Sequence, residues 1–245
     1  YREALLRESQ KDVSWKMIQN ICHEFRNPSV AVNGFVRRIR NTTSREKIMQ
    51  YCDLITKEVA GLEQKCNAMQ EYLEPVQLSP DFYSINRIIS NAIVQSENKF
   101  REYVIDGTIK INYTPIQDHV THCDGNKVAQ AIVHIIEGSA EKVNGKSTQM
   151  DFSVSFGENY TYNGTTIPKY VNISTLVKGL YPAKIELETI EEPLTATDQN
   201  PTEMHYAKAR KLIEANNGRF LVNPTKQGLQ ISMILPHITR EEYSY

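Results

Sequence analysis

The chain has 245 residues, 40% of them hydrophobic, which suffices for two small domains. Its formal net charge of -1 at pH 7 gives no support for binding to nucleic acid, and we expect no such partner. No apolar run approaches the length of a membrane span, so we expect this fragment to make no membrane contact.

Residues 18–39 predict a first helix with a contact seam. Apolar or small side chains recur there at alternating steps of three and four, at Ile18, Cys22, Phe25, Ser29, Val32, Val36 and Ile39. His23 falls one residue past a seam position, and Asn27 lies one turn further along the same face, so both are expected to face solvent. Glu24 follows His23 directly. Its carboxylate can orient one nitrogen of the His23 ring and take the proton from it while the other ring nitrogen acts as a nucleophile.

A second helical seam follows a turn at residues 41–44, where Ser44 predicts a helix start. This seam runs without interruption as far as Pro75, through Ile48, Cys52, Ile55, Val59, Leu62, Cys66, Met69 and Leu73. Two antiparallel helices joined by a short turn cannot bury their apolar stripes alone. Pairing two copies into a four-helix bundle buries them, so we expect a homodimer.

After the hairpin the pattern changes to short strands and helices. Residues 85–100, 124–141 and 207–215 have helical spacing, and strands are predicted at 109–113, 119–123, 150–156, 170–176 and 230–235. Residues 157–168 are predicted as a polar loop. We therefore expect an α+β protein, with a helical hairpin over residues 1–78 and an α/β sandwich over residues 79–245.

The run HEFRNP, from His23 to Pro28, resembles the H box of sensor histidine kinases. The order of the later elements is similar to the ATP-binding (Bergerat-type) domain of that family, and the resemblance covers nearly the whole chain. It implies a two-component signalling phosphoprotein in which His23 accepts a phosphoryl group and Glu24 assists it. It also implies that Asn27 orients a water molecule against the phosphoaspartate of a response regulator.

The ATP-binding boxes depart from the family pattern. Where the N box should offer an asparagine that holds magnesium on the phosphates, Gly138 stands, and glycine has no oxygen ligand to give. Leu176 stands in the place of the aspartate that accepts the adenine amino group. The second glycine box is replaced by residues 201–206, where Glu203 would repel a triphosphate.

Three functions remain open. The favoured one is a pseudokinase in a phosphorelay, a phosphotransferase or phosphatase that acts on a response regulator through His23 without ATP and needs no cofactor. The second is an ATP-dependent sensor histidine kinase, a transferase that uses MgATP to phosphorylate its own His23. The third is a noncatalytic dimeric scaffold for another kinase or regulator.

Two further expectations concern context and ligands. The chain begins inside a charged helical pattern at residues 1–8, which predicts a fragment of a longer sensor protein with an upstream sensory domain. Four cysteines without paired metal spacing indicate a reducing compartment, so we expect a cytoplasmic fragment of a protein that can be anchored in a membrane. His134 and His205 are interpreted as surface or packing residues, and no metal site is expected.

Overall fold

The computed structural model describes Cys22 and residues 25–99, 109–143, 147–162, 164–181 and 201–243, apart from the side chains of residues 68, 99 and 201–203. The chain divides into two compact units, one made of residues 1–74 and 192–201 and the other of residues 75–191 and 202–245. Among the described residues, no helix has both the length and the apolar character needed to cross a membrane.

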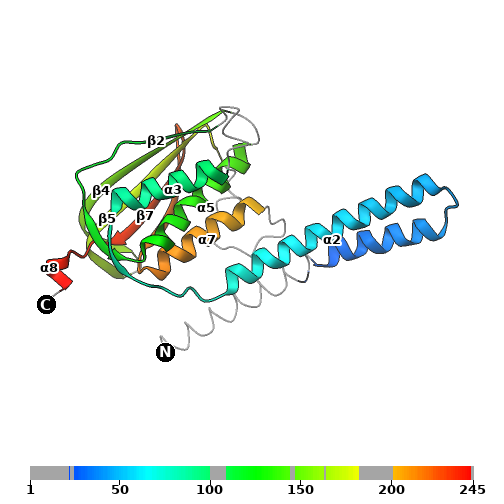
Figure 1. Ribbon diagram of the computed structural model, residues 1–245, viewed down its shortest axis with the longest axis horizontal. Helices are drawn as coiled ribbons and strands as arrows, with labels where there is room; N and C mark the ends of the chain where they lie inside the picture. The colour runs from blue at the N-terminus through cyan, green and yellow to red at the C-terminus, as the bar shows by residue number, and fades with distance from the viewer. Residues whose placement is uncertain are drawn as a thin grey trace. The chain divides into compact units, whose positions relative to one another are not determined.

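The first unit contains a helical hairpin (Figure 1). Residues 25–40 form one helix, and α2 (Arg45–Leu73) forms the other. Ser44 caps α2 as predicted, because its hydroxyl accepts a hydrogen bond from the backbone N–H of Lys47 at 3.4 Å. The rings of Phe35 and Tyr51 stack between the two helices, with their centroids 6.2 Å apart. The predicted hairpin is therefore confirmed.

The seams of the hairpin are only partly covered in a single copy. On α2, Met69 is buried, whereas Val59 and Leu73 are 42% and 56% exposed. Two of the seam cysteines, Cys22 and Cys52, are also exposed. One hairpin thus leaves an apolar stripe in water, which is the condition that favours pairing with a second copy. The homodimer itself stays a prediction.

The second unit is a two-layer α/β sandwich (Figure 1). Three helices, α3, α5 and α7, lie side by side over one face of a five-stranded sheet with strand order β2-β4-β5-β7-β6. Strand β2 runs parallel to β4, and the other neighbours in this sheet are antiparallel; β1 and β3 form a separate antiparallel pair. The elements are β1 (Asp81–Ser84), α3 (Ile85–Lys99), β2 (Ile109–Tyr113), β3 (Val120–Cys123), α5 (Gly125–Val143), β4 (Thr148–Tyr162), β5 (Thr165–Lys178), α7 (Pro201–Ala215), β6 (Arg219–Thr225), β7 (Gly228–Pro236) and α8 (Arg240–Tyr243).

The core lies between the helices and the sheet. Helix α5 contributes an apolar face that includes Ile132 and Ile135, which are both fully buried. The central strand β5 contributes Ile173 and Val177, which alternate with residues that point to the other face of the sheet. Burial of this continuous apolar layer is what holds α3, α5 and α7 against the strands.

The other face of the sheet carries polar side chains. Asp151 on β4 accepts hydrogen bonds from the side-chain amides of Asn112 and Gln149, each at 2.7 Å, and pairs with Lys178 at 2.7 Å. Desolvation raises the pKa of Asp151, but these three partners outweigh it and lower the pKa to about 2. The Asp151 carboxylate on this face of the sheet is therefore ionised at neutral pH.

The predicted loop at residues 157–168 is wrong, because the ends of β4 and β5 form a long hairpin there. The ladder continues through the pairs Tyr160–Ile167 and Thr161–Thr166. Pro168 has no backbone N–H to donate, but the residue opposite it is Asn159, at φ 55°, and this position is left out of the pairing. Pro168 therefore lies within β5, although a proline normally ends a strand.

Candidate functional site

The predicted phosphotransfer residues belong to the first helix. His23 and Glu24 lie outside the described residues. Asn27 lies on the helix formed by residues 25–40, and its side chain is exposed. An exposed amide is accessible to a partner protein, although the role of Asn27 stays a prediction.

Helix α5 is held firmly at its start by Asp124. One carboxylate oxygen of this residue accepts hydrogen bonds from the backbone N–H groups of Asn126 at 3.1 Å and Lys127 at 3.0 Å. The other accepts from the backbone N–H of Ser79 at 2.8 Å, and the backbone N–H of Asp124 donates to the Asn216 side chain at 2.8 Å. These bonds cap α5 and tie it to the end of α7.

Helix α7 packs directly on the later part of α5. Tyr206 is fully buried, and its hydroxyl lies 3.0 Å from the hydroxyl of Ser139. Since Ser139 donates to the carbonyl of Ile135 at 2.7 Å, it accepts from Tyr206. Tyr206 and Ser139 therefore join the two helices in a region that is closed to solvent.

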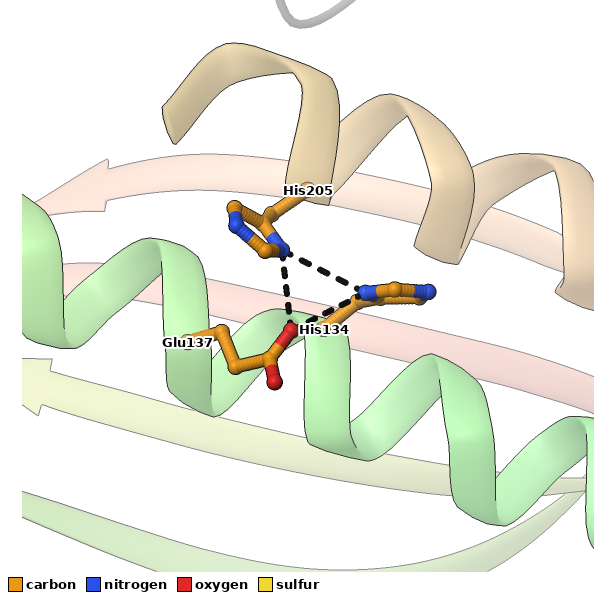
Figure 2. Close-up of side chains that lie close together, drawn as sticks. All are labelled: His134, Glu137 and His205. Carbon is orange, nitrogen blue, oxygen red and sulfur yellow. Dashed lines mark hydrogen bonds and ion pairs between the residues drawn. The ribbon is translucent and has the colours of Figure 1, made fainter. Parts of the chain in front are cut away.

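Beside this contact, two histidines and a glutamate converge (Figure 2). Nδ1 of His205, on α7, lies 3.0 Å from Oε2 of Glu137, on α5. Nδ1 of His134, one turn earlier on α5, lies 3.3 Å from the same oxygen and 3.3 Å from Nδ1 of His205. The side chain of Glu137 is 4% exposed, and those of His134 and His205 are 15% and 21% exposed. We call these three residues the His–Glu–His cluster.

The second ring nitrogen of His205 also meets a carboxylate. Nε2 of His205 lies 3.4 Å from Oε1 of Glu141, one helical turn beyond Glu137 on α5. Burial lowers the pKa of His205, but its interactions with Glu137 and Glu141 outweigh this and raise the pKa to about 9. At neutral pH the His205 ring is therefore a cation that lies between the carboxylates of Glu137 and Glu141.

The whole chain is similar to known proteins both in structure and in sequence. A solved structure, histidine kinase ThkA in complex with response regulator protein TrrA, matches 97% of this chain and 66% of that chain, with a TM-score of 0.64 and 20% identity. The fold is that of a sensor histidine kinase core. Sporulation kinases C and B of Bacillus subtilis (strain 168) are each 20% identical to this chain, over 237 and 243 residues. Each alignment covers 96% of this chain and 52% of the relative, so the chain spans about half the length of these curated proteins. No family model matches the chain.

These comparisons confirm the resemblance to the sensor histidine kinase family and the order of a helical hairpin followed by an α/β domain. Gly138, which the family resemblance aligns with the magnesium-binding asparagine of the N box, is buried on α5, and this alignment stays a prediction. In the second glycine box, at residues 201–206, the Glu203 side chain lies outside the described residues. The repulsion expected from Glu203 stays a prediction.

Strand β5 contains Leu176, which the family resemblance places at the position of the adenine-binding aspartate. Ile173 and Val177 belong to the core, so alternation places Thr175 on the side covered by helices and Leu176 on the opposite face. Thr175 is fully buried, and its hydroxyl has no hydrogen-bond partner among the described residues. Leu176 therefore faces away from the helices, and its place in the adenine-binding box stays a prediction.

The sequence interpretation missed the His–Glu–His cluster. It treated His134 and His205 as surface or packing residues, whereas the structure brings both to one buried carboxylate. The available signal was the spacing of three between His134 and Glu137, which puts both on one face of a helix. The third member, His205, is 71 residues away from His134, and no local spacing connects the two.

Proposed function

We propose that the chain is the core of a two-component pseudokinase. In this proposal it exchanges phosphoryl groups with a response regulator, or dephosphorylates one, through the H-box helix and without binding ATP. The observation that supports the proposal is the contact between α7 and α5, where Tyr206 meets Ser139 and the nearly buried Glu137 meets His205, because the family resemblance expects nucleotide phosphates near these helices.

The charges and bulk between these helices disfavour a triphosphate. Glu137 lies nearly buried at the contact, and Glu141 lies beside it. Two like unit charges 4 Å apart near a protein surface repel each other by about 4 kcal/mol, so a phosphate placed against Glu137 loses affinity. The His205 imidazolium is already shared between these two carboxylates. Tyr206 fills the adjoining space with a buried ring.

The proposed chemistry needs only groups of the first helix and of the regulator. In transfer, the His23 imidazole attacks the phosphorus of the regulator's acyl phosphate; the P–O bond to aspartate breaks and a P–N bond forms. In hydrolysis, the Asn27 amide positions a water molecule that attacks the same phosphorus, and aspartate and inorganic phosphate leave. Both steps depend on positioning and on a metal ion supplied by the regulator, so neither requires bound nucleotide.

Two observations support a regulator as partner and a dimer as the working form. The exposed Asn27 and the half-covered seams belong to the same hairpin, so a bundle of two copies would bury the seams and leave Asn27 accessible. The similar structure of ThkA contains a response regulator protein in its complex.

The first test is titration calorimetry of the full chain with MgATP at millimolar concentration, with a conventional histidine kinase core as positive control. We expect no saturable heat. Saturable binding would overturn the pseudokinase proposal and restore autophosphorylation of His23 as the mechanism.

The second test follows the loss of phosphoryl groups from receiver domains charged with acetyl phosphate. We expect the wild-type chain to accelerate the loss from its cognate domain. Hydrolysis should fall in Asn27→Ala, and transfer should fall in His23→Gln. A scaffold without chemistry would leave the rate of loss unchanged by the wild-type chain and by both variants.

A further inference from the structure

The geometry points to a binding site for a divalent transition-metal ion, with Zn²⁺ as the best-fitting ion, formed by Nδ1 of His134, Oε2 of Glu137 and Nδ1 of His205. This inference stands apart from the proposed phosphotransfer function, since it concerns residues of α5 and α7 only.

The three atoms have the separations that a tetrahedral ion requires. The edges of their triangle are 3.0, 3.3 and 3.3 Å. Zinc binds imidazole nitrogen and carboxylate oxygen at about 2.0–2.2 Å, and two such ligands at a tetrahedral angle lie about 3.3 Å apart. A point about 2.05 Å from all three atoms lies roughly 0.9 Å out of their plane, close to the value of about 0.7 Å in a regular tetrahedron. Three protein ligands would leave the fourth position open to water or another ligand.

The contact places two imidazole nitrogens and one carboxylate oxygen within 3.3 Å of one another. Each imidazole nitrogen presents either one N–H or one lone pair in the plane of its ring. If both nitrogens carry hydrogen, both donate to Oε2 of Glu137, and the two donor nitrogens lie only 3.3 Å apart. If one nitrogen is a lone pair, it faces the lone pairs of the Glu137 carboxylate. A single cation between the three atoms makes every one of these contacts attractive.

The donor set selects the class of metal. Two imidazole nitrogens and one carboxylate oxygen suit zinc and its transition-metal neighbours, whereas magnesium and calcium prefer oxygen ligands. The cluster is near the surface, because His134 and His205 keep 15% and 21% of their side chains exposed. An ion can therefore enter from solvent.

The surroundings hold the ligands as a metal site requires. A histidine that binds a metal usually directs its other ring nitrogen to a carboxylate or carbonyl, and Nε2 of His205 faces Glu141 at 3.4 Å. The next residue, Tyr206, is fixed to Ser139 on α5 by the buried hydroxyl contact. The ligand from α7 is thus set against the two ligands from α5, and a bound ion would clamp these helices together.

The test is a Zn²⁺ titration of the full chain after removal of metal with a chelator, in competition with a chromophoric indicator. We expect one equivalent per chain with a Kd of about 1 µM or tighter. Co²⁺ is the second probe, because a four-coordinate Co²⁺ ion absorbs visible light more strongly than the hydrated ion. Absence of saturable binding, or a Co²⁺ spectrum like that of the hydrated ion, would overturn the inference without any variant.

Variants then assign the ligands. His134→Gln, Glu137→Gln and His205→Gln should each weaken Zn²⁺ binding by more than about 100-fold, since even loss of an outer partner of a ligand costs about 10–100-fold. The matched control is His122→Gln, which removes an imidazole from β3, where its ring stacks on Tyr243. Circular dichroism checks that each variant is folded. Equal affinity in all four variants would mean that the ion binds elsewhere and would refute the site.

Discussion

Replacement of Asp124 by alanine should destabilise the α/β unit by about 1.5–3 kcal/mol. The variant loses the cap of α5, where one carboxylate oxygen accepts from Asn126 and Lys127, and such a loss costs about 0.5–2 kcal/mol. It also leaves the backbone N–H of Ser79 without its acceptor, which costs about 1 kcal/mol more. Asp124 is 4% exposed, so water replaces these bonds poorly.

The assay is urea unfolding followed by far-ultraviolet circular dichroism, with hydrogen exchange of the first turn of α5 as a local readout. Asp124→Asn is the matched control, because its amide keeps one acceptor oxygen and should retain part of the stability. A loss below about 0.5 kcal/mol in Asp124→Ala would refute the capping argument. Equal losses in Asp124→Ala and Asp124→Asn would show that the acceptor oxygens are not the cause.

Three further predictions test the sheet, the metal site and the packing of α5. The pKa of Asp151 is lowered to about 2, so this group adds stability that is complete above its unfolded pKa of 3.8 and is lost as pH falls through about 2. Because the side chain is a third exposed, the effect should be about 1 kcal/mol or less, measured as a drop in urea midpoint that Asp151→Asn removes. Glu141→Gln should weaken Zn²⁺ binding about 10–100-fold without abolishing it, as measured by the same indicator competition. Gly125→Ala should lower thermal stability by about 1–3 kcal/mol in a melting experiment, because its new Cβ would lie 2.4 Å from the Tyr83 ring.

The helical hairpin was predictable because its pattern is local. The three-and-four spacing of α2 continues from Ile48 to Leu73, and one capping residue, Ser44, marks its start. The β4–β5 hairpin was not predictable, because Pro168 and a glycine at position 157 are ordinary signals for a loop. The ladder continues past them because paired residues on both sides of Pro168, such as Tyr160–Ile167 and Glu158–Lys169, hold the register of the two strands.

The candidate site residues also fall into two kinds: those in a local sequence pattern and those brought together from distant parts of the chain. The H box depends on residues within one helical turn, so the sequence alone could single out Asn27. The His–Glu–His cluster depends on α7 packing against α5, and a contact across 71 residues leaves no periodic trace. The assignment of Leu176 to the adenine-binding box also depends on an alignment within β5, where a shift of one residue turns the side chain to the other face.

The two attachments of α7 to α5 make the His–Glu–His cluster sensitive to small rotations. Asn216 holds the end of α7 to the start of α5, and His205 lies eleven residues earlier, about 16 Å along the helix axis. A tilt of about 10° pivoting on Asn216 would therefore sweep His205 through about 3 Å, more than the length of a bond between nitrogen and a metal. The same tilt would break the buried contact between Tyr206 and Ser139, so an intact cluster would report that α7 keeps its angle to α5.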